Sequence, residues 1–147
     1  MERYRWTTRP SNASAEGNTG QIVLTDTTFW IDLLEERRDR RRGPAGTFIA
    51  RHRVSTLALS IVSWGELAEG FADFAGLETF LRGVPVLMLP QQIAWEASRI
   101  QRELAALGGR LGENDCWIAA TARAWGRPLL SRDTAFERVP RLRVVRY

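Results

Sequence analysis

Four acidic residues stand where predicted strands end or predicted helices begin: Asp26, Glu66, Asp115 and Asp133. Carboxylates that meet in one pocket repel one another, which raises their pKa values unless a cation compensates. A site built only from carboxylate oxygens suits Mg²⁺ or Mn²⁺. Such an ion lowers the pKa of a bound water and neutralises charge on a phosphate, so the pattern is typical of metal-dependent phosphodiester hydrolysis.

The rest of the composition leaves catalysis to carboxylates, hydroxyls and arginines. His52 is the only histidine, which excludes a ribonuclease mechanism based on paired histidines. Together with Cys116, the only cysteine, it cannot supply a zinc site of two cysteines and two histidines. All 21 basic residues are arginine, so a lysine nucleophile and a P-loop lysine are absent as well.

The length and charge of the chain narrow its class. Its 147 residues, 44% of them hydrophobic, fit one globular domain. The formal net charge of +4 permits a nucleic acid or an acidic protein as partner. We find no apolar run long enough for a membrane span, no secretory signal and no second cysteine for a disulfide. We therefore expect a cytoplasmic protein without a membrane partner.

Hydrophobic patterns alternate between strand and helix along the chain. Strands are expected at 22–24, 56–60, 84–89, 128–131 and 142–145, and helices at 26–36, 47–53, 61–71, 75–81, 91–107, 115–125 and 133–137. This order predicts an α/β fold, a three-layer α/β/α sandwich around a mostly parallel sheet. Residues 1–20 lack apolar periodicity and are expected to form a disordered tail, which leaves 21–147 as the domain.

The predicted topology brings two of the acids together. Asp26 and Asp133 each follow a strand, and ligands of parallel sheets bind beyond the carboxyl ends of the strands. Asp115 shares a helix face with Ile118 and Ala122, which should pack on the sheet, and an acid there is costly unless it is paired or binds a cation.

Each acid also has a purely structural explanation. Asp26 and Asp133 could be helix N-caps, which are common at junctions between strands and helices. Glu66 could close a capping box with Ser63. Asp115 could stabilise the positive N-terminal end of its helix.

The segments around the acids resemble the PIN-domain family and, within it, the VapC toxins of bacterial type II toxin–antitoxin pairs. Four segments carry the resemblance in order: Leu24–Leu34 with Asp26, Ser60–Gly70 with Glu66, Asn114–Ala122 with Asp115, and Leu129–Phe136 with Asp133. It covers residues 22–147. The first segment has Thr28 where asparagine or serine is commoner in the family, so a hydroxyl is kept at that position.

The resemblance implies a PIN-like fold and an Mg²⁺- or Mn²⁺-dependent endoribonuclease that acts as the toxin of such a pair. Asp26, Asp115 and Asp133 would hold the metal, with Glu66 as a further ligand or water positioner, and a metal-activated water would hydrolyse the RNA phosphodiester. The implied partners are RNA, a cognate antitoxin and a second copy of the chain. Two alternatives stay open: a catalytically inactive PIN-like binding module, and a stand-alone DNA- or RNA-processing nuclease.

Further residues are expected to support the site or to contact partners. Polar contacts beside the acids are expected from Thr28, Ser131 and Asn114. A groove lined by Trp30, Leu33 and Leu34 is expected to hold an apolar helix of a partner. Five arginines at residues 37–42 form either a solvated basic face or a contact for RNA phosphates or for the antitoxin.

Overall fold

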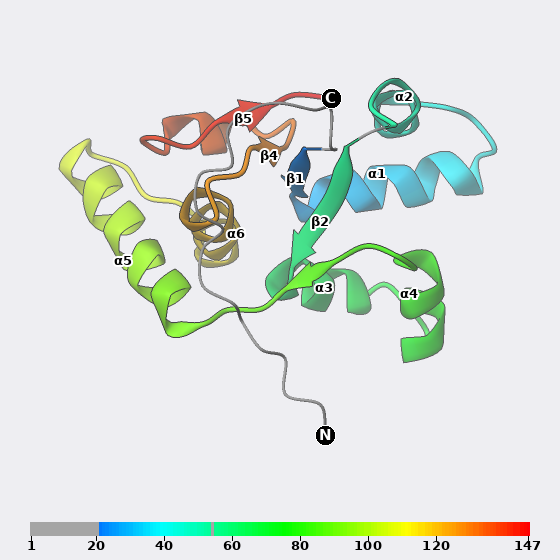
Figure 1. Ribbon diagram of the computed structural model, residues 1–147, viewed down its shortest axis with the longest axis horizontal. Helices are drawn as coiled ribbons and strands as arrows, with labels where there is room; N and C mark the ends of the chain where they lie inside the picture. Colours follow the sequence, from blue (N-terminus) through cyan, green and yellow to red (C-terminus); the bar gives the residue numbers. More distant parts are fainter. Residues whose placement is uncertain (1–20, 54) are drawn as a thin grey trace.

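Figure 1 shows the computed structural model of the protein, which describes residues 21–53 and 55–147. The strands are β1 (Ile22–Thr25), β2 (Thr56–Ser60), β3 (Val86–Leu87), β4 (Leu129–Leu130) and β5 (Val144–Val145). The helices are α1 (Thr27–Arg38), α2 (Pro44–Arg51), α3 (Ile61–Ala68), α4 (Phe74–Phe80), α5 (Gln91–Ala106), α6 (Glu113–Ala124) and a 3₁₀ helix, η1 (Thr134–Arg138). The expected tail at residues 1–20 lies outside the described residues. None of the described helices is long and apolar enough to cross a membrane.

All five strands form one parallel sheet in the order β3-β2-β1-β4-β5. The chain first adds β2 and β3 on one side of β1, and then α5 and α6 carry it back to add β4 and β5 on the other side. In the register, Thr25 at the end of β1 pairs with Leu59 of β2 and with Leu130 of β4. Strand order therefore reverses at β1, and a parallel sheet forms its ligand-binding crevice at such a reversal.

Alternation along the strands divides the core into two layers, because successive side chains of a strand point to opposite faces. Val23 of β1 packs in one layer with Phe29 of α1. Leu24 packs in the other layer with Ile100 of α5 and Ile118 of α6. Figure 1 shows α5 and α6 on one side of the sheet and α1 and α2 on the other. The three-layer α/β/α sandwich expected from the sequence is confirmed.

The edge strands are shorter than the sequence predicted. The strand expected at 84–89 contains only Val86–Leu87, between Pro85 and Pro90. Proline has no N–H for a ladder and limits strands at a sheet edge. The strand expected at 142–145 likewise shortens to Val144–Val145 at the opposite edge.

Two helix predictions also need correction. The helix expected at 47–53 begins at Pro44, because proline is well suited to the first position of a helix, and it ends at Arg51. The helix expected at 91–107 ends at Ala106, and the side chain of Leu107 is 72% exposed.

A buried carboxylate joins α1 to α2. Glu36 lies in the last turns of α1, is 7% exposed, and accepts hydrogen bonds from the N–H groups of Ala45 (2.9 Å) and Gly46 (2.8 Å) at the start of α2. Burial opposes its ionisation, but the backbone N–H groups at this helix end outweigh burial and lower the pKa of Glu36. A Cβ at Gly43 would lie 2.4 Å from Glu36 Oε1, so a larger residue there would displace the carboxylate.

We predict that Glu36→Gln destabilises the fold by about 1–3 kcal/mol, because an amide can accept at only one end and leaves a buried N–H unpaired. The pKa of Glu36 is lowered on folding, so its stabilisation is present above the unfolded-state pKa and is lost as pH falls through the folded-state pKa. The gap between wild type and variant in urea unfolding should therefore narrow in acid. Glu35→Gln, on the exposed neighbour, is the control. Equal loss in both variants would refute the capping role.

Candidate active site

The reversal of strand order places candidate acids at one edge of the sheet. Asp26 follows β1 directly, and Asp133 comes three residues after β4, the strand paired with β1. Glu66 lies on α3, which leaves the sheet from the end of β2 on the other side of β1. Asp115 lies in the first turn of α6. Topology thus delivers all four acids to the region of the crevice.

Asp26 is the most buried of the four acids, with 3% of its surface exposed. It is the N-cap of α1, and its Oδ1 accepts a hydrogen bond from Phe29 N at 3.0 Å. Its Oδ2 accepts a short hydrogen bond from the Ser131 hydroxyl. Ser131 Oγ in turn accepts from the backbone N–H of Asp133 at 3.0 Å. Ser131, which the sequence singled out beside the acids, therefore connects two of them.

The residue before Asp26 anchors it to the sheet. Thr25 is fully buried, and its hydroxyl donates to the carbonyl oxygen of Ala58 in β2 at 3.1 Å. The same hydroxyl accepts a hydrogen bond from the indole N–H of Trp30, one turn into α1. This contact fixes the start of α1 against β1 and β2, and with it the position of Asp26.

Glu66 is held by a threonine that the sequence analysis did not select. The hydroxyl of Thr27 donates to Glu66 Oε1 at 2.8 Å, whereas the sequence had pointed to Thr28. The proposed capping box of Ser63 and Glu66 is wrong. Ser60 is the N-cap of α3 and accepts from Ser63 N, because α3 begins directly after β2. No signal in the sequence separates Thr27 from Thr28, because the choice depends on how α1 is rotated about its axis.

The N-cap explanations for Asp26 and Asp133 are confirmed, but the caps leave lone pairs free on both carboxylates. Asp133 is exposed, and it caps η1 by accepting a hydrogen bond from Ala135 N at 2.8 Å. Asp115 is half-buried beside exposed Asn114 in the first turn of α6. A carboxylate can accept about four hydrogen bonds, so these caps do not exhaust it.

The acids influence one another's ionisation. Burial raises the pKa of Asp26, and the charges of Asp115 and Asp133 raise it further, against the lowering effect of its hydrogen bonds. Burial also raises the pKa of Asp115, and Asp133 and Glu66 add to that rise. All four carboxylates therefore take part in one mutually repulsive group.

A divalent cation fits the chemistry of this group, but not its spacing as the side chains stand. Over residues 21–53 and 55–147, no three acid, histidine or cysteine side chains converge closely enough to hold an ion together. The oxygen-only donors and their mutual repulsion match what Mg²⁺ or Mn²⁺ would neutralise. Coordination by several of the acids would require their side chains to move closer together.

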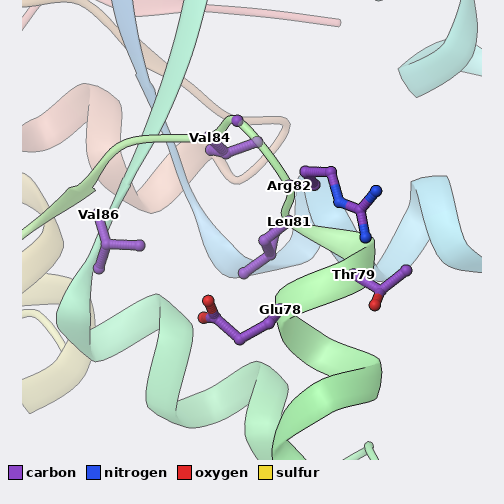
Figure 2. A pocket seen from close by; sticks show the side chains of 7 residues that line it. Glu78, Thr79, Leu81, Arg82, Val84 and Val86 are labelled. Atoms are coloured by element: carbon purple, nitrogen blue, oxygen red, sulfur yellow. The ribbon is translucent and has the colours of Figure 1, made fainter.

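Two hollows lie away from the acids. One of about 340 Å³ lies at the junction of α4 and β3, lined by residues that include Glu78, Arg82 and Val86 (Figure 2). A second, of about 1000 Å³, lies along α5 and α6 and includes Trp95 and Arg123. Neither lining contains any of the four acids.

Comparison with known proteins gives this arrangement a family. The family model for the PIN domain matches residues 23–142, a range that contains all four acids. The chain belongs to the PIN domain family. The four motifs on which the sequence resemblance was drawn thus led to the correct family.

Individual relatives of this PIN domain agree with the assignment. The chain is 28% identical over 134 residues to Ribonuclease VapC4 of Mycobacterium tuberculosis. The match covers 84% of this chain and 95% of that protein. The structure of VapBC2 from Rickettsia felis, bound to a DNA fragment from their promoter, matches with TM-score 0.72 and 19% identity, over 86% of this chain and 98% of that one. VapBC-5 from Mycobacterium tuberculosis, of the VapBC family of toxin–antitoxin systems, matches with TM-score 0.62 and 19% identity over the same shares. These two likenesses show a shared fold.

The raised pKa values predict a metal-dependent stability. Asp115 binds its proton more tightly in the folded state, so metal-free stability should fall as pH rises from the unfolded-state carboxyl pKa through the folded-state pKa. Asp115→Asn removes this loss. In EDTA the variant should therefore melt at a higher temperature than wild type at neutral pH, with the difference vanishing in acid, where Asp115 is protonated in both states.

Adding Mg²⁺ should reverse the order, because the ion stabilises the ionised wild-type site and has one ligand fewer in the variant. Thermal melts followed by circular dichroism, with and without excess Mg²⁺, give both readings. A variant less stable than wild type in EDTA at neutral pH would show that Asp115 serves α6 as a helix-end charge instead.

Proposed function

We propose that this PIN domain is the toxin of a type II toxin–antitoxin pair, a divalent-metal-dependent endoribonuclease that hydrolyses RNA phosphodiesters. The observation that carries the proposal is the mutually repulsive carboxylate group around the buried Asp26, at the strand reversal of a PIN domain. The name of the relative Ribonuclease VapC4 supports RNA as the substrate.

The site residues have distinct roles in this proposal. Asp26, Asp115 and Asp133 would hold Mg²⁺ or Mn²⁺, and Glu66 would be a further ligand or position a water. When bound, the ion would activate water and offset charge on the phosphate. Ser131 binds one carboxylate oxygen of Asp26, and Thr27 binds one carboxylate oxygen of Glu66, so both carboxylates keep lone pairs for a cation.

The proposed partners are an antitoxin and a second copy of the chain. The matching structures of VapBC2 and of VapBC-5, a member of the VapBC family of toxin–antitoxin systems, support an antitoxin. A partner arginine or lysine that reaches the acid group would compensate its repulsion as a cation does. The expected groove of Trp30, Leu33 and Leu34 is not the place for a partner helix, because Trp30 and Leu33 are 3% and 4% exposed and form part of the core.

Metal-dependent RNA cleavage separates catalytic acids from helix caps. Wild type should cleave RNA in Mg²⁺ or Mn²⁺ and lose that activity in EDTA. Asp26→Asn keeps a cap for α1 but loses a charge, and should lower cleavage by at least about 100-fold. Asp73→Asn is the matched control, since Asp73 also caps a helix, accepting from Gly76 N at 2.8 Å, but lies outside the acid group.

Gel assays of purified proteins, with contaminating nuclease excluded, decide between the two readings. If Asp26→Asn and Asp73→Asn cleave alike, the aspartate is a cap and nothing more. Cleavage undiminished by EDTA would rule out metal dependence.

Growth tests the toxin role separately from the chemistry. Induction of the wild type in a host without its antitoxin should arrest growth, because uncontrolled RNA cleavage depletes essential transcripts. Asp26→Asn should restore growth to that of an empty vector, and a small protein encoded beside the toxin gene should relieve the arrest when co-expressed. Normal growth at verified expression of active enzyme would leave a stand-alone nuclease as the function.

A further inference from the structure

An arginine lies between two parts of the acid site. Arg132 follows Ser131, whose hydroxyl binds Asp26, and precedes Asp133. Its side chain is 59% exposed, whereas the carboxylate of Asp26, which the Ser131 hydroxyl binds, is buried. If the Arg132 side chain were free to move, its positive charge would be attracted to the carboxylates and would compete with a metal ion for them.

Arg132 is held in place by a second acid on a different element. Its Nη2 donates to Asp32 Oδ1 at 3.0 Å, and the Asp32 side chain on α1 is only 16% exposed. The other oxygen of Asp32 accepts a hydrogen bond from the hydroxyl of Tyr147 at 2.7 Å. The Tyr147 ring packs edge-on against buried Phe29, with ring centroids 5.0 Å apart. Three distant segments therefore fix one guanidinium.

This arrangement differs from an ordinary surface ion pair. Most exposed pairs hold neither partner firmly and add little stability. Here Asp32 is itself fixed by Tyr147 and by its place on α1, so the guanidinium has a defined position, on the residue that lies between Ser131 and Asp133 in the chain. Arginine has five N–H donors in a planar fork, and the bond to Asp32 leaves donors for a second anion.

We infer that Arg132 binds a phosphate of the RNA strand beside the acid group, and that Asp32 and Tyr147 are positioning residues that hold its guanidinium for this contact. The inference rests on the proposed nuclease function. Phosphate is the anion that fits, because a fork of N–H donors binds its oxygens in pairs and RNA presents one phosphate at every nucleotide. Four carboxylates alone would repel that strand, and Arg132 offsets the repulsion where the strand must approach.

Cleavage kinetics test the contact. With full-length protein in Mg²⁺, Arg132→Ala should raise KM for a single-stranded RNA by about tenfold or more and lower kcat less, since a phosphate contact acts mainly in binding. Arg132→Lys keeps the charge without the fork and should fall between. The control is Arg141→Ala: Arg141 is 61% exposed and pairs with Glu103 at 2.6 Å, at a site that contains none of the four acids.

Salt dependence gives a reading that a structural role would not change. Binding of fluorescein-labelled RNA is measured by anisotropy on an Asp115→Asn background, which suppresses cleavage, with and without Arg132→Ala. Loss of one phosphate contact should reduce the slope of log affinity against log salt by about 0.7–1. Arg132→Lys should restore the slope.

The positioning residues make their own prediction. Tyr147→Phe keeps the ring against Phe29 and removes only the hydroxyl, so KM should rise a few-fold while the salt slope stays unchanged. Asp32→Asn frees Arg132 toward the acids, so the Mg²⁺ concentration for half-maximal thermal stabilisation should increase. Neither effect is expected from Arg141→Ala.

The outcomes distinguish this inference from the function on which it rests. If the wild type cleaves RNA but Arg132→Ala has the same KM and salt slope as Arg141→Ala, then Arg132 makes no phosphate contact. The proposed nuclease function would still hold in that case. A wild type that neither binds nor cleaves RNA removes both. Melting temperatures in EDTA identify any variant that fails to fold. If Arg132→Ala does not fold, Arg132→Lys takes its place: a salt slope equal to that of the wild type supports the phosphate contact, and a lost slope contradicts it.

Discussion

The hydrogen bond between the Ser131 hydroxyl and the buried carboxylate of Asp26 joins the two halves of the site. It connects residues 105 positions apart in the chain, at the end of β4 and the end of β1. Burying a carboxylate is costly unless hydrogen bonds compensate it. Ser131 and the N–H of Phe29 compensate only in part, because the pKa of Asp26 remains raised. The acid is thus placed accurately but kept unsatisfied, which leaves it with affinity for a cation.

Hydrogen bonds elsewhere in the fold offset the unfavourable free energy of the acid group. Thr25 fixes β1 to β2 and to Trp30, and Glu36 satisfies the start of α2. These side chains are buried and hydrogen-bonded, so they hold the frame of the crevice without a ligand. Asp26 and Asp115 contribute the opposite effect, since their pKa values are raised and ionising them costs free energy in the folded state. The stabilisation from Glu36 and the cost at these two acids therefore depend on pH in opposite directions.

The sequence predicted the layers, the parallel sheet and the region of the acids, because these follow from alternating apolar patterns and from residues that end strands. It could not choose between Thr27 and Thr28, since that choice depends on the rotation of α1 about its axis. It placed Trp30 and Leu33 in a partner groove because amphipathic stripes look alike whether they face the core or a ligand. It did not connect Asp32 with Arg132 and Tyr147, because three segments meet there through the tertiary fold alone.

The pairing of β1 with β4 also has a consequence for the order in which the protein folds. Leu24 of β1 pairs with Leu129 of β4, so the central strand of the sheet cannot be paired on both sides until β4 has been made. Contacts between residues so far apart in sequence form late in folding, because a long loop must close, at a cost in entropy, before the contact can stabilise the chain. On a translating ribosome, Asp26, Glu66 and Asp115 emerge before β4 can pair. The acid group is consequently incomplete until β4 has been made, so under the proposed function a growing chain could not cleave RNA before that point.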